Sequence, residues 1–188
     1  MKEKTTSRRD FLKASVVTSC LGCGFVSLMH GQAQEDPCHE QLKKNRYQMS
    51  VWYEKDKIKT IQPLQEKYGQ ELVSVLKENT IKRTTETFKK RNIERRDLTA
   101  VKNILWNSLE QGFEFEVVHD TPQHLEYKVT RCYLAELANE LNAPEVGFAL
   151  HCAWDYGFCR GLNPDIQFTR TKTLMKGDDC CNHYYKLG

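Results

Sequence analysis

The 188-residue chain lacks the features that mark several classes of protein. It has no internal repeat, low-complexity tract or proline-rich linker, which excludes solenoid and disordered architectures. A long hydrophobic run is also missing, because Ser, Thr and Gly interrupt the apolar stretch near the N-terminus, and a membrane anchor needs about 20 apolar residues. The hydrophobic share of 39% is enough for one buried core, so the length predicts a single domain with a short targeting segment.

An excess of basic charge is missing from most of the chain. Residues 1–34 hold five of the 28 Lys and Arg residues and two of the 25 Asp and Glu residues, so residues 35–188 carry no net charge. A nucleic-acid-binding protein needs a surplus of Lys and Arg to meet phosphates. We therefore expect no nucleic-acid partner.

The first 33 residues have the pattern of an export signal. Residues 8–13, Arg-Arg-Asp-Phe-Leu-Lys, match the twin-arginine signature, and a moderately apolar stretch then leads to Ala33, where small residues suit signal-peptidase cleavage. Lipidation at Cys20 or Cys23 is the alternative form of processing. We expect the twin-arginine translocase to export the chain, which would then act in the periplasm or elsewhere outside the cytoplasm.

Paired-cysteine motifs are missing from the exported part, residues 34–188. The spacing Cys-x-x-Cys occurs only at Cys20 and Cys23, inside the signal, which disfavours a thiol-redox protein, and no zinc-finger spacing is present. Six cysteines remain after the signal: Cys38, Cys132, Cys152, Cys159, Cys180 and Cys181. Disulfides, metal ligands and free thiols are all compatible with this set.

Residues 38–110 have the composition of helices, with strong helix formers and almost no glycine. Pro63 and Gly69 interrupt this region, and Asp97 is a suitable N-cap. The pattern predicts three helices, over about 38–60, 63–91 and 97–110. They either cover a sheet or mediate a homodimer.

Residues 112–187 have a different pattern. Periods of two and of 3.6 residues alternate there and predict, in chain order, two strands, two helices and two strands: 113–117, 125–129, 132–141, 145–160, 166–174 and 181–187. This order predicts an α+β fold, in which helices cover an antiparallel sheet.

One predicted helix carries a cluster of reactive side chains. At 100° per residue, His151, Asp155, Cys159 and Cys152 share an arc of about 100°. Side chains of these types transfer protons or bind metals. The alternative is that the cysteines are small core residues and that His151 and Asp155 form a solvated pair.

The last predicted strand carries a second cluster, since Cys181, His183 and Tyr185 lie on the same face. Together with Cys152 and Asp155 of the helix, Cys181 and His183 would form a site for a divalent metal such as zinc. A catalytic Cys–His pair and a disulfide are the alternatives.

Several short pieces of sequence occur in a characteristic order: Gly112-Phe113-Glu114-Phe115, Val129-Thr130-Arg131-Cys132-Tyr133, Cys152-Ala153-Trp154-Asp155, Asn163-Pro164, Thr171-Lys172-Thr173-Leu174, Gly177-Asp178 and Cys181. In this order they resemble the L-2-amino-thiazoline-4-carboxylic acid hydrolase family. The resemblance covers the region from Gly112 to Tyr185. It implies hydrolytic opening of a cyclic amidine-like ring, at a C–N bond, to a carbamoyl-cysteine.

Such a reaction needs an activated water, a proton donor to the ring nitrogen and stabilisation of the tetrahedral centre. The candidate catalytic residues are Asp155, Cys181 and His183, with Asp155 or a metal-bound hydroxide activating the water. The acid would be His183 or His151.

Two arginines are candidates for binding the substrate. Arg131 or Arg170 would hold a carboxylate in a bidentate contact. The alternative to a hydrolase is a non-catalytic module on the same fold that binds a small ligand or a metal.

Overall fold

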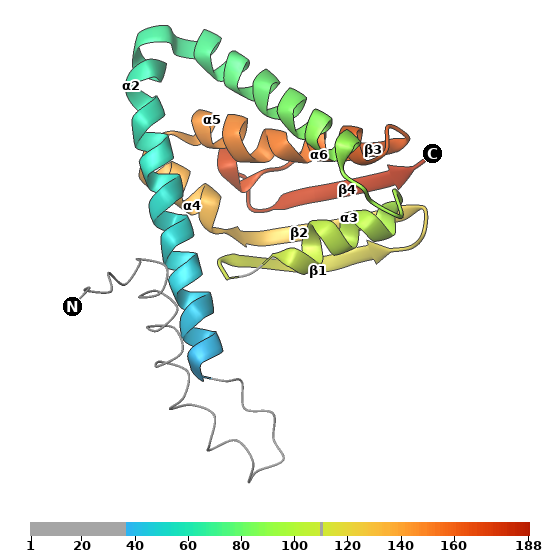
Figure 1. Cartoon of the computed structure of the whole chain (residues 1–188). Helices are drawn as coiled ribbons and strands as arrows, with labels where there is room; N and C mark the ends of the chain where they lie inside the picture. Colours follow the sequence, from blue (N-terminus) through green and yellow to red (C-terminus); the bar gives the residue numbers. More distant parts are fainter. Residues whose placement is uncertain (1–36, 110) are drawn as a thin grey trace, which may run out of the picture. The chain divides into compact units, whose positions relative to one another are not determined.

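A four-stranded antiparallel sheet organises the C-terminal part of the chain in the computed structural model, which describes residues 37–109 and 111–188 (Figure 1). The strand order is β1-β2-β4-β3. The strands are β1 (Phe113–Asp120), β2 (His124–Cys132), β3 (Ile166–Thr169) and β4 (Cys181–Leu187). With the helices before and between these strands, the predicted α+β class is confirmed.

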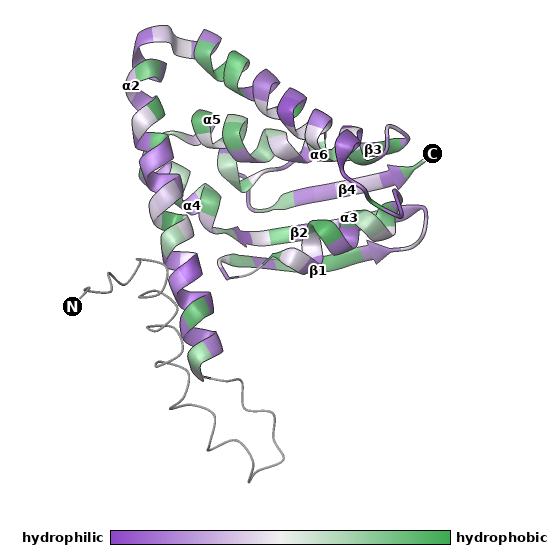
Figure 2. Ribbon diagram, in the orientation of Figure 1, coloured by the Kyte–Doolittle hydropathy of each residue, from purple (hydrophilic) through white to green (hydrophobic). Residues whose placement is uncertain are grey.

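The helices occupy the chain before β1 and the connections between the strands. They are α2 (Pro37–Lys90), α3 (Leu98–Ile104), η1 (Trp106–Ser108), α4 (Tyr133–Glu140), α5 (Pro144–Gly147), η2 (Phe148–Cys152), α6 (Ala153–Leu162) and η3 (Leu174–Lys176). Most of α2 is hydrophilic, with hydrophobic residues at intervals (Figure 2). Across residues 37–109 and 111–188, no helix combines the length and the apolar character needed to cross a membrane. The predicted export signal, residues 1–33, lies outside the described residues.

The chain divides into two compact units, Met1–Arg46 and Tyr47–Gly188. The described part of the first unit is the start of α2, where Lys43 and Glu40 form an ion pair of 3.0 Å. The second unit holds the sheet and the remaining helices, and all contacts described below lie within it.

The long helix α2 is interrupted at Gly69 and not at Pro63. Gly69 has φ 58° and ψ −139°, a conformation that side chains with a Cβ rarely adopt, so the helix divides here into two arms. Pro63 lies inside the first arm. The predicted break between 60 and 63 is therefore wrong, because a proline removes only one backbone hydrogen bond and the packing of Ile58, fully buried, holds the arm in place.

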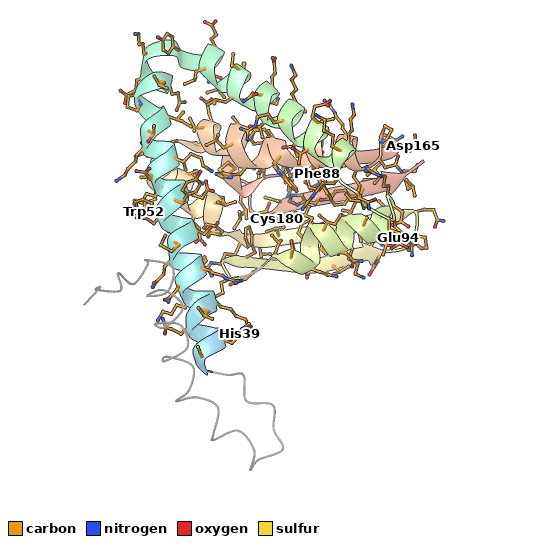
Figure 3. All side chains as sticks on the ribbon, in the orientation of Figure 1. His39, Trp52, Phe88, Glu94, Asp165 and Cys180 are labelled. Atoms are coloured by element: carbon orange, nitrogen blue, oxygen red, sulfur yellow. The ribbon has the colours of Figure 1, made fainter. Side chains whose placement is uncertain are left out.

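Both arms of α2 contribute to the core. Ile58 of the first arm packs with Ala135 of α4 and Val146 of α5. Phe88 of the second arm, labelled in Figure 3, packs edge-to-face on Phe158 of α6, with ring centroids 4.7 Å apart. The second arm thus rests on α6, the helix that carries the predicted Asp155.

Strand β3 ends at Thr169, five residues earlier than predicted. Beyond it, the side-chain oxygen Oδ1 of Asn182 accepts hydrogen bonds from the backbone N–H groups of Thr171 and Lys172, at 3.0 and 2.6 Å. The side chain of Asn182 therefore replaces the strand partner that these residues would need. The chain is free to turn at this point, and Arg170 stands at the turn.

Candidate functional site

Five residues predicted to form a site, together with the alternative acid His151, line one cavity of about 240 Å³. They come from two layers of the fold: Cys152 and Asp155 from the helices, Cys181 and His183 from β4, and Arg170 from the segment after β3. The structure therefore brings the helix cluster and the strand cluster together. The remaining walls of the cavity are mostly apolar.

The inward face of β4 is set by its pairing with β2. Cys181 pairs with Val129 and His183 pairs with Tyr127, and these four side chains are all buried. The predicted shared face of Cys181, His183 and Tyr185 is confirmed by their burial. Only the first two line the cavity, since Tyr185 is fully buried deeper in the core.

The helix side of the site contains a π turn, η2, which continues directly into α6. A π turn changes the register of a helix and often occurs at functional sites. His151, Cys152 and Asp155 all line the cavity, whereas Cys159 is buried in the main core. Three of the four residues predicted to form the helix cluster therefore lie at the cavity. Cys159 is instead a small residue of the hydrophobic core, as the alternative interpretation predicted.

Asp155 and Arg170 form a buried ion pair. Nη1 of Arg170 donates to Oδ2 of Asp155 at 2.7 Å, and only 2% of the arginine side chain is exposed. Nη2 donates to the carbonyl oxygen of Cys152 at 2.9 Å. Burial lowers the pKa of Arg170, but Asp155, with smaller contributions from Cys152, Tyr156 and Cys181, raises it by more in total, so the guanidinium stays charged. Each of these two charges is compensated by the other.

His183 is held by the same guanidinium. Its Nε2 lies 3.1 Å from Nη1 of Arg170 and 3.5 Å from Oδ2 of Asp155. A guanidinium only donates hydrogen bonds, so Nε2 must accept and the ring proton lies on Nδ1. Nδ1 is buried and has no hydrogen-bond partner. The site therefore holds a neutral imidazole with a free N–H donor.

The pKa of His183 is lowered below its usual value of 6.5, and burial of the ring is the main cause. The charge of Arg170 lowers this pKa further, whereas Asp155 opposes the shift. The unfolded chain binds the proton at a higher pH, so the contribution of His183 to stability is present above about pH 6.5 and is lost as the pH falls.

We expect urea unfolding to show a free energy that declines between about pH 7.5 and about pH 5.5, by at most about 1.4 kcal/mol per pH unit from this group. The His183→Gln variant should decline less steeply. Equal slopes for the two proteins would contradict this assignment.

Three cysteine thiols line the cavity, and their surroundings differ. Burial raises the pKa of Cys132 to about 11 and that of Cys152 to about 12, so both stay protonated at neutral pH. Sγ of Cys181 accepts a backbone hydrogen bond from the N–H of Leu174 at 3.2 Å and donates one to Oγ1 of Thr173 at 3.6 Å. Of the three, Cys181 is the thiol that shares the inward face of β4 with His183, which makes it the candidate nucleophile.

The predicted metal ligands do not form a metal site. In the described part of the chain, no group of three or more His, Cys, Asp and Glu side chains is arranged to hold a metal ion. Oδ2 of Asp155 and Nε2 of His183 both face the guanidinium of Arg170, a permanent positive charge that would repel a metal cation. Cys152 and Cys181 are thus left without the other two ligands of the predicted set.

Arg131 lies away from the cavity. Its Nε donates to Oε1 of Glu136 at 2.9 Å, and 43% of its side chain is exposed. It does not line the cavity. Of the two arginines predicted to bind the substrate, only Arg170 is at the site.

The structure adds Glu54, which the sequence analysis did not select. Oε2 of Glu54, on the first arm of α2, lies 3.2 Å from Nε2 of His151 and 2.7 Å from Nζ of Lys57. Burial raises the pKa of Glu54, but the contacts with His151 and Lys57 lower it by more, so the group is a carboxylate. The sequence offered one indication that Glu54 faces the rest of the fold. It lies one helical turn before the buried Ile58, and this spacing places both residues on the same face of the helix.

Comparison with known proteins gives the family. The model of the L-2-amino-thiazoline-4-carboxylic acid hydrolase family matches residues 32–185, which is most of the chain. A comparison with curated proteins gave no match. The matched range includes every residue of the cavity described above. The chain belongs to the L-2-amino-thiazoline-4-carboxylic acid hydrolase family.

Proposed function

We propose that the chain is a hydrolase that opens a cyclic amidine-like ring at a C–N bond, with Cys181 as the nucleophile. L-2-amino-thiazoline-4-carboxylate, for which the family is named, would yield a carbamoyl-cysteine. The observation that carries the proposal is that Cys181 and His183, whose Nδ1 has no hydrogen-bond partner, line the same cavity. A nucleophile and a fixed donor are the two groups that addition to a C=N bond requires.

In the first step, Sγ of Cys181 attacks the amidine carbon, and its proton passes to the ring nitrogen. A carbon–sulfur bond forms as the C=N double bond becomes single. The N–H of His183 donates to a heteroatom of the tetrahedral adduct, and it is in place beforehand because Arg170 fixes the ring. This preorganisation is the contribution of the buried ion pair.

In the second step, the ring C–N bond breaks and the departing nitrogen becomes an amine. It takes its second proton from the exocyclic amino group, and His151, which contacts Glu54 and lines the cavity, is placed to transfer it. Water then adds to the carbon bound to Cys181, with Asp155 accepting a hydrogen bond from it. Collapse of this adduct restores the thiol and leaves a carbamoyl group on the substrate sulfur.

A second candidate is a module that binds a small ligand without turnover. Two observations favour it: Asp155 and Arg170 already compensate each other, and most of the cavity wall is apolar. Such a module would hold the ring compound in the same cavity. It would release the compound unchanged.

The test is ring opening by the purified full chain. The protein is incubated with L-2-amino-thiazoline-4-carboxylate, and mass spectrometry follows the addition of one water molecule. We expect turnover by the wild type and none by a Cys181→Ser, Asp155→Asn double variant. A wild type that binds the compound without converting it would overturn the hydrolase proposal in favour of the binding module.

We also propose that the chain is exported by the twin-arginine route and acts outside the cytoplasm. The arginine pair and the apolar stretch after it support this proposal. In a bacterial host, an Arg8→Lys, Arg9→Lys variant should remain in the cytoplasm while the unchanged chain reaches the periplasm, as followed by cell fractionation. Export of both proteins to the same extent would contradict the proposal.

A further inference from the structure

Three ring nitrogens of residues that line the cavity are buried and have no aligned hydrogen-bond partner: Nε1 of Trp106, Nδ1 of His183 and Nε2 of His151. Beside the nitrogen of His151 lies a carboxylate, with Oε2 of Glu54 at 3.2 Å. This distance is within reach of a hydrogen bond, although the direction is not aligned for one. Catalytic hydrogen bonds of free enzymes are often poorly aligned and tighten when the substrate binds.

The carboxylate of Glu54 is held in place by the residues around it on the first arm of α2. Ser50 and Ile58 lie one turn before it and one turn after it, so the three share a face of the helix. Oγ of Ser50 and the hydroxyl of Tyr133 form a hydrogen bond of 2.7 Å, and Ile58 is fully buried. Nζ of Lys57 donates to Oε2 of Glu54 at 2.7 Å. The carboxylate therefore has a fixed orientation.

This carboxylate determines which nitrogen of His151 carries the proton. A carboxylate only accepts hydrogen bonds, so in the neutral ring the proton lies on Nε2 and Nδ1 is bare. Among the described residues, the buried polar atoms without a partner include Nε2 of this ring but not Nδ1, and the ring lines the cavity. His183 has the opposite arrangement, because Arg170 donates to its Nε2 and its proton lies on Nδ1.

From these observations we propose that Glu54 is a positioning residue of the site, which holds the ring proton of His151 on Nε2 so that the bare Nδ1 acts as the base at the cavity. The role in turnover rests on the proposed function, whereas the position of the proton does not. The two imidazoles then act in opposite ways, since Nδ1 of His183 donates a proton to a hydrogen bond and Nδ1 of His151 accepts one. The first arm of α2 is thereby part of the catalytic machinery.

The base acts in the step that opens the ring. As the ring C–N bond breaks, Nδ1 of His151 takes a proton from the exocyclic amino group and gives it to the departing ring nitrogen. The exocyclic nitrogen forms a C=N double bond with the electron pair of the lost N–H bond, so protons and electrons balance. Between the two transfers the ring of His151 is an imidazolium, and the adjacent carboxylate of Glu54 stabilises its charge.

NMR of the full chain, isotopically labelled at its histidines, tests the position of the proton at a pH where the ring is neutral. A His151→Gln variant assigns the resonance, and correlations to both ring nitrogens show which one carries the proton. We expect the proton on Nε2, at low field because a carboxylate accepts it, and Glu54→Leu should move it to higher field. A proton on Nδ1, or an unmoved resonance in folded Glu54→Leu protein, would overturn the proposal. The wild-type spectrum decides if this variant does not fold.

Turnover tests the role of Glu54 separately. Glu54→Leu should lower kcat for ring opening of L-2-amino-thiazoline-4-carboxylate by about 100-fold, the size of a general-base effect. KM should change by less than about threefold, because Glu54 acts through His151 and does not touch the substrate. An unchanged kcat, or a loss of activity that comes only from a raised KM, would overturn the positioning role.

The matched control is Glu140→Gln. It breaks the ion pair of 2.8 Å between Lys55 and Glu140, which joins the same arm of α2 to α4. Neither residue lines the cavity, so kcat and KM should stay at the wild-type values. Equal losses of kcat in Glu140→Gln and Glu54→Leu would overturn the proposal. A wild type that does not open the ring would count against the hydrolase alone, because the NMR spectrum still decides the position of the proton.

Discussion

Replacing Asp155 with Asn is expected to lower the free energy of unfolding by about 3 kcal/mol or more. The variant leaves the guanidinium of Arg170, whose side chain is 2% exposed, buried without its counter-charge. Arginine cannot escape this cost by losing a proton. Urea unfolding of the wild type and the variant, followed by circular dichroism, measures the difference.

Two further variants identify the cause. An Asp155→Leu, Arg170→Met double replacement removes both charges and should be more stable than Asp155→Asn, because no unpaired charge remains. Glu136→Gln breaks an exposed ion pair with Arg131 and should cost less than about 1 kcal/mol. If Asp155→Asn costs no more than Glu136→Gln, the buried pair does not have the role assigned to it.

Replacing Cys181 with Ala is expected to lower kcat/KM for ring opening by at least about 1000-fold, or about 4 kcal/mol of transition-state stabilisation. The variant removes the sulfur that forms the covalent adduct and leaves His183 and the ion pair in place. Stopped assays with mass-spectrometric detection of the product measure the change. Circular dichroism spectra that match the wild type would show that the fold is retained.

Cys180 is the matched control for this variant. It is also buried and directly precedes β4, where Figure 3 labels it, but it does not line the cavity. Cys180→Ala should keep most of the activity. If Cys181→Ala keeps as much activity as Cys180→Ala, then attack by water must replace attack by the thiol in the mechanism.

The sequence predicted the strand half of the site because its signal is short-range. Side chains alternate strictly along a strand, so Cys181 and His183 had to share a face once β4 was recognised. The hydrophobic residues of that face then indicated which side is buried. The sheet and its order of helices and strands followed from the same periodicities.

The remainder depended on contacts between residues far apart in the chain. Arg170 pairs with Asp155 across 15 residues, and the contact of Glu54 with His151 joins the first arm of α2 to a π turn. Periodicity carries no information about such pairs. Periodicity also predicted that Arg170 lies inside a strand. The strand ends before it because the side chain of Asn182 accepts the hydrogen bonds of the next two backbone N–H groups, and the pattern of hydrophobic residues does not show such a contact.

The most direct test of the central claim, that this cavity is the ligand site and His183 its donor, is a crystal structure of the protein with 2-aminothiazole bound. We predict density for the ring inside the cavity, with a ring heteroatom within hydrogen-bond distance of Nδ1 of His183 and Sγ of Cys181 facing the amidine carbon. The ring bound elsewhere on the molecule, or an empty cavity at saturating ligand, would contradict the account.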